Sequence, residues 1–121
     1  MKANVLGTYY RIRYETLEEN PLFKSCDGYC DRYLKIIHIR CYTDSDEDRN
    51  ETTISDDALQ ICEQKTLRHE LIHAFMYESG LDANSKYDCA WAINEEMVDW
   101  MAIQMPKIML AYESVLKQQQ N

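Results

Sequence analysis

The chain has 121 residues, of which 45% are apolar and 28% charged, and these proportions exclude a disordered protein and favour one globular domain over residues 1–121. The formal net charge of −8, with no run rich in lysine or arginine, disfavours binding to the phosphate backbone of nucleic acids. No stretch approaches the roughly 18 apolar residues of a membrane span, and the first residues lack the apolar segment of a signal peptide, so we expect a cytoplasmic protein with no membrane partner.

Strands are expected in the first third of the chain. Residues 4–16 place apolar and aromatic side chains at alternate positions, and residues 33–42 are rich in β-branched and aromatic side chains. A short third strand is expected either over residues 22–25 or near Tyr29, and Gly28 favours a hairpin. The sequence therefore predicts a small sheet in this region.

A long helix is expected in the middle of the chain. Residues 43–53 are acidic and polar without apolar periodicity, which indicates an exposed loop. Ser55 and the two aspartates after it are typical of a helix N-cap and an acidic first turn. The pattern predicts a helix over residues 56–79 that ends at Gly80.

A second helix is expected to begin between residues 88 and 91 and to run past Tyr112. Pro106 lies inside it and should kink or restart it. Methionines recur at every fourth position, which indicates core packing or a dimer contact. These residues are Met97, Met101, Met105 and Met109.

The five cysteines are an odd number, and without a secretory signal we expect free thiols rather than a disulfide framework. Cys26 and Cys30 have a spacing that suggests a metal site, but structural zinc normally takes four ligands and no second close pair completes such a site. We therefore interpret both as small, partly buried apolar residues.

The clearest chemistry lies in the His-Glu-x-x-His sequence of His69, Glu70 and His73, inside the first long helix. Four helical residues turn through about 400°, so the two histidines stand one above the other and can bind one ion. Glu70 lies about 100° round, where a base can take a proton from a water activated by the metal. The alternative is a hydrogen-bonded pair of helix histidines with a surface glutamate between them.

This helix has two apolar faces, which predicts a position between the sheet and the second helix and places the metal between the two helices. The face expected to cover the sheet carries Leu67, Leu71, Ala74 and Phe75, and the opposite face, with both histidines, carries Ala58, Leu59, Cys62 and Met76.

A third ligand should come from the second helix. Glu95 and Asp99 lie on its apolar side, whereas Glu96 points away, so Glu95 is the better ligand candidate. Asp99 is placed to accept the free ring N–H of a metal-binding histidine. Two imidazoles and a carboxylate are the ligands that zinc takes at hydrolytic sites. The alternative is a solvated, acidic helix start.

The two motifs together, His69-Glu70-x-x-His73 and Asn94-Glu95-x-x-x-Asp99, resemble those of the gluzincin branch of the zincin metallopeptidases. The continuation over residues 102–106 is similar to the second motif of ImmA/IrrE-type peptidases, and the chain resembles small phage and prophage proteins of this kind. The resemblance implies an α+β fold with a minimal zincin core: a small antiparallel sheet over an active-site helix, with a second helix bearing the glutamate. Larger gluzincins add a subdomain that supplies an oxyanion-stabilising histidine or tyrosine.

We therefore expect a zinc metallopeptidase with one zinc ion per chain, acting on a protein or peptide substrate such as a regulatory or host protein. The substrate should pair with the strand over residues 33–42. His38, Tyr77 and Tyr87 are candidate oxyanion donors, although a solvent-facing position is the more common one for a strand histidine such as His38. The alternatives are a zinc-stabilised binding or regulatory protein without catalysis, and a metal-free helical adaptor.

Overall fold

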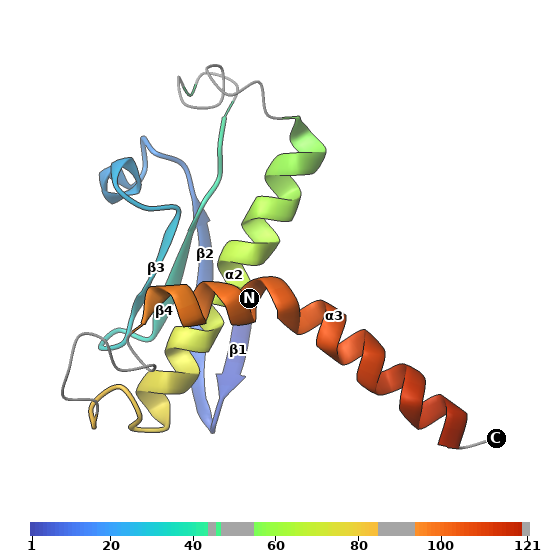
Figure 1. The fold of residues 1–121 in the computed structure, drawn as a ribbon. Helices are drawn as coiled ribbons and strands as arrows, with labels where there is room; N and C mark the ends of the chain where they lie inside the picture. Colours follow the sequence, from blue (N-terminus) through green and yellow to red (C-terminus); the bar gives the residue numbers. More distant parts are fainter. Residues whose placement is uncertain (44–45, 47–54, 85–93, 120–121) are drawn as a thin grey trace.

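The computed structural model describes residues 1–43, 46, 55–84 and 94–119, and these residues form an α+β fold (Figure 1). In chain order the elements are β1 (Lys2–Val5), β2 (Thr8–Glu15), η1 (Pro21–Lys24), β3 (Gly28–Asp31), β4 (Ile36–Arg40), α2 (Asp56–Glu78) and α3 (Glu95–Gln119). The predicted fold class is confirmed. Most of the predicted acidic loop, the predicted start of the second helix and Tyr87 lie outside the described residues.

The four strands form one sheet in the order β1-β2-β4-β3. The outer pairs, β1 with β2 and β3 with β4, are antiparallel, but β2 and β4 are parallel. The expectation of an antiparallel sheet is therefore wrong for the central pair. The reason is the connection: after β2 the chain runs through η1 and β3 before it enters β4, which is long enough to bring β4 alongside β2 in the same direction.

The predicted single strand over residues 4–16 is a hairpin. Leu6 and Gly7 have φ values of 52° and 93°, so both occupy the left-handed region that a tight two-residue hairpin turn requires. The Asn4 side chain accepts a hydrogen bond from the backbone N–H of Gly7 at 2.8 Å. Leucine rarely adopts this conformation, so Leu6 gave no turn signal in the sequence.

The third strand is β3, around Tyr29, whereas residues 22–25 lie in and just after the 3₁₀ helix η1. Asn20 caps η1 by accepting a hydrogen bond from the N–H of Leu22. The predicted strand over residues 33–42 begins later in the structure, at Ile36, because a turn precedes it. In this turn the Asp31 side chain accepts hydrogen bonds from the backbone N–H groups of Tyr33 and Leu34.

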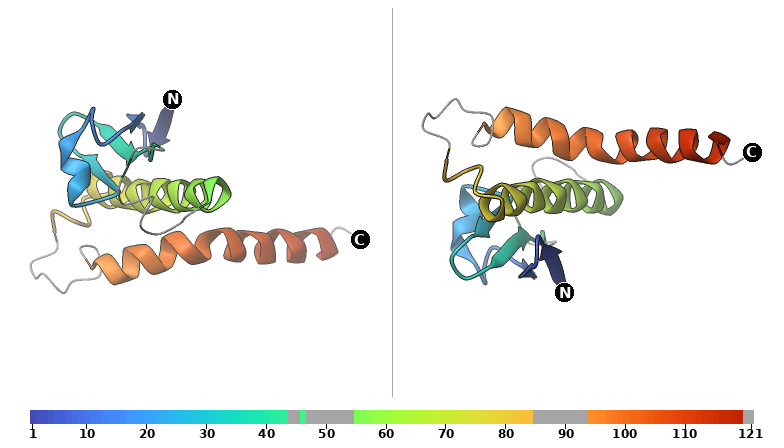
Figure 2. Two further views of the ribbon diagram at one scale, coloured as in Figure 1. Left: turned by 90° about the horizontal axis from the view of Figure 1, so that it is seen from above. Right: turned by 90° about the horizontal axis from the view of Figure 1, so that it is seen from below.

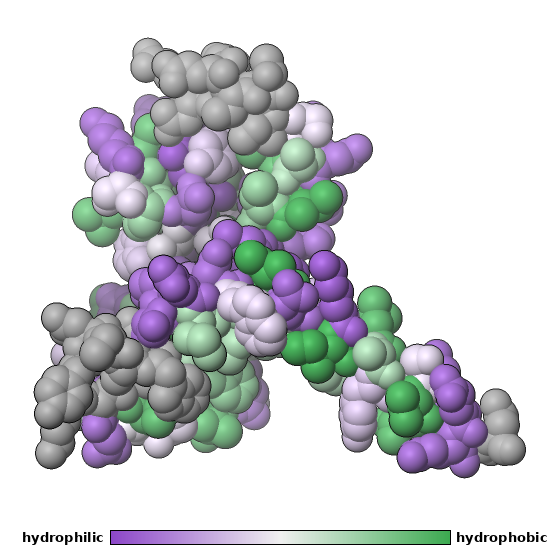
Figure 3. All heavy atoms as spheres, in the orientation of Figure 1, coloured by the Kyte–Doolittle hydropathy of each residue, from purple (hydrophilic) through white to green (hydrophobic). Residues whose placement is uncertain are grey.

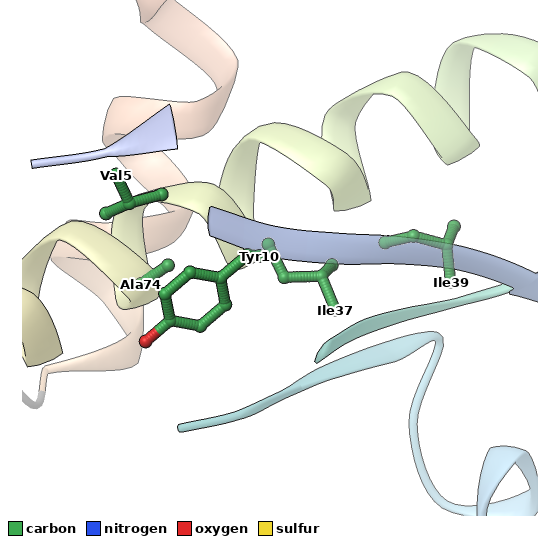
Figure 4. Packing of buried hydrophobic residues seen from close by; sticks show 5 residues of the cluster. All are labelled: Val5, Tyr10, Ile37, Ile39 and Ala74. Carbon is green, nitrogen blue, oxygen red and sulfur yellow. The ribbon is translucent and has the colours of Figure 1, made fainter. Parts of the chain in front are cut away.

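The main core lies between the sheet and α2 (Figure 4). Leu67 and Leu71 pack against it, as expected of the sheet-facing side of α2, but Phe75 is 43% exposed and does not belong to this face. The buried residues of the main core are Val5, Tyr10, Ile37, Ile39 and Ala74.

Both ends of α2 lie where the sequence predicts them. Ser55 caps the first turn, and Gly80 follows the last turn with φ +78°.

A second core joins α2 to α3, so the molecule has three layers in the order sheet, α2, α3 (Figure 2). Cys62, expected on the α3-facing side of α2, is exposed. Ile72, Met76, Val98 and Ala102 are the buried residues of this core. The predicted position of α2 between the sheet and the second helix is confirmed.

The second half of α3 extends away from the other two layers (Figures 1 and 2). The helix continues through Pro106 but changes direction along its length, which is the kink expected of an internal proline. Met101 packs against the second core, whereas a core position is wrong for Met97, Met105 and Met109, which are exposed. Within the described residues, neither α2 nor α3 has an apolar stretch long enough to cross a lipid bilayer.

Candidate metal centre

Three side chains from α2 and α3 converge on one point. His69 and His73 stand one helical turn apart with their Nε2 atoms 3.2 Å from each other. Glu95, in the first turn of α3, places one carboxylate oxygen 2.9 Å from Nε2 of His69 and the other 3.1 Å from Nε2 of His73. The residues predicted as ligands thus come from the elements that were expected to supply them.

This arrangement fits a metal ion. Ligand atoms about 2.1 Å from a tetrahedral ion lie roughly 3.4 Å from one another, close to the separations seen here. The candidate ligand atoms of His69, His73 and Glu95 lie within 4.8 Å of one another. Burial lowers the pKa of His73, which favours the neutral imidazole that a metal requires.

The start of α3 positions Glu95. The side-chain oxygen of Asn94 accepts hydrogen bonds from the N–H groups of Glu96 and Met97, so the first helical turn begins with Glu95. About two turns further along α3, Arg68 of α2 donates a hydrogen bond of 2.6 Å to the backbone oxygen of Ala102. These contacts hold the carboxylate of Glu95 opposite the two imidazoles.

Glu70 lies beside the candidate ligands and is only 6% exposed. Its carboxylate is 4.0 Å from Nε2 of His69. Burial, reinforced by the negative charge of Glu95, raises the pKa of Glu70 to about 7. Gly28 allows β3 to approach it closely, because a Cβ atom there would lie 2.7 Å from Cγ2 of Thr66 and 3.4 Å from Cγ of Glu70.

Asp99 lies behind His69, on the side away from the other ligands. Its carboxylate oxygen is 3.3 Å from Nδ1 of His69 and 3.1 Å from Nζ of Lys65. Partial burial opposes ionisation of Asp99, but the hydrogen bonds and charges of Lys65 and His69 outweigh it and lower the pKa. An ionised Asp99 can accept the Nδ1–H of His69 and leave Nε2 free to bind a metal.

The candidate ligands line a cavity of about 460 Å³, and β3 forms one of its walls. Cys30 of β3 and Cys26, which precedes this strand, line the cavity as free, partly buried thiols, in agreement with their interpretation as small apolar residues. Burial raises the pKa of Cys30 to about 12, so its thiol stays protonated. Neither cysteine belongs to the converging group of possible ligands found among the described residues.

Tyr77 also lines the cavity, one helical turn beyond His73. Its ring stacks on the His73 ring with centroids 6.0 Å apart, and the guanidinium of Arg32 lies over the Tyr77 ring, 5.1 Å from its centroid. Burial raises the pKa of Tyr77 to about 12, so its hydroxyl remains a hydrogen-bond donor. The structure thus places one of the candidate oxyanion donors at the site.

His38 does not line this cavity, and its expected solvent-facing position is wrong. Its side chain is buried and pairs through Nδ1 with the carboxylate of Glu15. Its ring stacks on that of Tyr29, with ring centroids 4.4 Å apart. The reason is that Tyr29 of β3 stacks on its ring and the ring of Phe23 of η1 packs against Tyr29 in turn. The sequence also gave no indication of Lys65 or of the wall formed by β3, since both depend on how α2 packs against other elements.

Comparison of the chain with protein-family models, with curated proteins and with solved structures finds no match. The case for a function therefore depends on the geometry of the site. That geometry consists of two imidazole nitrogens and one carboxylate in contact, with a second, buried carboxylate beside them.

Proposed function

We propose that this protein is a zinc-dependent peptidase that uses His69, His73 and Glu95 as metal ligands. The observation that carries the proposal is the convergence of these three side chains beside the buried Glu70. Two imidazoles and one carboxylate are the protein ligands of zinc at many hydrolytic sites, where a fourth position is left for water or substrate.

In this proposal Glu70 is the general base. A zinc ion held by these ligands would supply a Lewis acid that activates water and polarises a carbonyl. Glu70 takes a proton from the attacking water and returns it to the amine that leaves when the peptide bond breaks. Its buried position in the cavity wall keeps the carboxylate close to the reacting atoms.

The substrate pairs with β3 rather than with the predicted strand over residues 33–42. That strand, β4, is flanked by β2 and β3 and has no open edge. β3 is the outermost strand on this side of the sheet, and it lines the cavity beside Glu70. An extended peptide added to its outer edge would run past the candidate metal centre.

A second function is a zinc-stabilised binding or regulatory protein without catalysis. The observation that favours it is that Glu95 connects α3 to the histidines of α2, so an ion here would also join two layers of the fold. Catalysis distinguishes the two functions, because only the peptidase requires Glu70 to move a proton.

The first experiment is elemental analysis of protein purified without added metal, for the wild type, His73→Ala and Glu95→Ala. We expect about one zinc per chain in the wild type and a large loss in both variants. Glu96→Ala is the matched control, because Glu96 is an exposed neighbour on the same helical turn and does not belong to the ligand group. Zinc that is absent from the wild type, or unaffected by loss of Glu95, would contradict the proposed site.

The second experiment tests catalysis with Glu70→Gln, assayed on unfolded protein substrates and peptide libraries. The amide keeps the shape of the side chain but cannot accept the proton, so we expect zinc to be retained and hydrolysis to be lost. Turnover at the wild-type rate would exclude Glu70 as the base. A wild type that binds zinc but cleaves none of these substrates would favour the binding protein.

A further inference from the structure

The second half of α3 carries an apolar surface that the other described residues leave exposed. The residues of this surface, which we call the α3 stripe, are Met105, Ile108, Met109, Tyr112, Val115 and Leu116. Each exposes between 37% and 57% of its surface. Figure 3 shows hydrophobic residues on this projecting segment, away from the sheet and α2.

The α3 stripe continues a surface that is already used for packing. Spaced at three and four residues, its members lie on one side of the helix in line with Val98 and Ala102, which are fully buried against α2. Beyond Pro106 the helix leaves α2, and the same side is left exposed. An apolar face that is about three residues wide in every seven is typical of a helix that packs against another helix.

We propose that the α3 stripe binds the α3 stripe of a second copy of this chain, with the two helices antiparallel. In the register that places Ile108 opposite Met109 of the other copy, Met105 lies opposite Tyr112 and Met101 opposite Leu116. Every facing pair is then apolar, and the two-fold symmetry makes each contact occur twice. This self-complementarity identifies a second copy as the partner that fits the surface.

A groove at the base of the stripe fits the same arrangement. It has a volume of about 350 Å³ and lies between α2 and the start of the stripe, with Phe75, Met101 and Met105 among its apolar lining residues. From Met101 to Leu116 an α-helix rises about 22 Å. In the antiparallel pair, the tip of each helix therefore reaches the groove of the other copy and covers Phe75, which is 43% exposed.

Charge favours the antiparallel direction. Residues 103–119 contain two lysines and one glutamate, for a net charge of +1. Because the whole chain has a net charge of −8, the remaining residues together carry −9. A parallel pair would place two strongly acidic bodies side by side, whereas an antiparallel pair separates them along the helix axis. No charged residue belongs to the stripe itself.

The exposed area is close to what a stable dimer needs. Six large side chains, each with roughly half of its surface free, offer on the order of 600 Å² per copy. The groove adds to this area. Standard protein interfaces bury about 800 Å² per partner, so the stripe and the groove together are large enough for a specific contact.

Sedimentation analysis of the full chain over roughly 1–100 µM tests the proposal. We expect a dimer for the wild type and, for Ile108→Glu, a dissociation constant raised on the order of 100-fold or more, because each copy would bury an unpaired charge. Leu110→Glu is the matched control: Leu110 is 67% exposed on the same segment but lies outside the stripe, so this variant should remain dimeric. A monomeric wild type, or equal dissociation of both variants, would overturn the proposal.

Mixing two variants tests the direction of pairing. Met105→Lys and Tyr112→Glu should each weaken the dimer, and circular dichroism checks that both remain folded. In an antiparallel pair the new lysine of one copy faces the new glutamate of the other, so an equimolar mixture should form heterodimers. If both variants are monomeric alone and the mixture is also monomeric, the antiparallel register is wrong.

Discussion

Two glutamates of the site lie in different environments that suit different chemistry. Glu70 is buried, and burial together with the charge of Glu95 raises its pKa to about 7. The side chain of Glu95 is 69% exposed and lies in the first turn of α3, where the helix dipole favours a negative charge. A bound cation would lower the pKa of Glu70 and leave it ionised, as a general base must be.

Tyr77→Phe tests whether a hydroxyl at the end of the cavity stabilises the oxyanion. If Tyr77 donates to the developing charge, its loss should lower kcat by about 10²-fold or more and leave zinc content unchanged. Steady-state kinetics on a cleaved peptide measure this effect. Tyr33→Phe is the control, because Arg32 also contacts the ring of Tyr33, which is 82% exposed outside the cavity. Equal activity of both variants and the wild type would remove Tyr77 from the mechanism.

The predicted site residues share one property: their relative positions follow from helical periodicity. His69, Glu70 and His73 lie on one helix and Glu95 and Asp99 on another, so spacing alone gives their directions. The structure brings these five together. The positions of Gly28 and His38 relative to the site could not be predicted, because they depend on which strand lies at the sheet edge and how closely it approaches α2. The contact of Lys65 with Asp99 could not be predicted either, because it depends on how α3 packs against α2.

At the scale of elements, capping residues in the sequence predicted the ends of α2, whereas the pairing of strands could not be predicted. Ser55 and Gly80 mark the ends of α2 because capping and left-handed residues act on their immediate neighbours. The parallel pairing of β2 with β4 joins residues more than 20 positions apart, and no local pattern encodes it. For this reason the α+β class was predicted correctly, whereas the direction of the central strand pair and the strand at the sheet edge were not.

Hydrogen exchange tests the role of β3. The backbone N–H of Arg40 donates a hydrogen bond to the backbone oxygen of Asp27. Because bonded pairs alternate in an antiparallel ladder, the backbone N–H of Tyr29 faces β4 while that of Cys30 faces the outer edge of β3. A peptide added to the zinc form of Glu70→Gln should slow exchange of the Cys30 amide and leave that of Tyr29 nearly unchanged. Exchange of Cys30 that is unaffected by saturating peptide would exclude strand addition at this edge.

At the scale of the whole molecule, α2 is the one helix of the described part that contributes to both cores. The sheet holds α2 through the main core, and through a bond that Tyr10 donates to Glu78, which also pairs with Lys35. By contrast, α3 is attached through the smaller second core, the bond from Arg68 and the contacts of Glu95 and Asp99. The candidate metal centre therefore lies at the interface that is held by the smaller core.

Metal binding should consequently change the stability of the fold as well as its chemistry. Zinc that binds only the folded chain stabilises it by about 2.7 kcal/mol at a free concentration 100 times the dissociation constant. For a domain of this size, such a change raises Tm by roughly 10 °C. Differential scanning calorimetry with zinc and then with excess chelator measures this difference.

Glu95→Ala and Glu96→Ala separate a specific site from general binding of zinc to an acidic protein. Zinc should raise the Tm of Glu96→Ala as much as that of the wild type, because this variant keeps all three ligands. Glu95→Ala loses the only one of the three ligands that α3 supplies, so its Tm should respond little to zinc even though both histidines remain. An equal rise in Tm in both variants would show that zinc stabilises the protein without joining α3 to α2. Both the structural role of the site and the assignment of Glu95 as its third ligand would then be wrong.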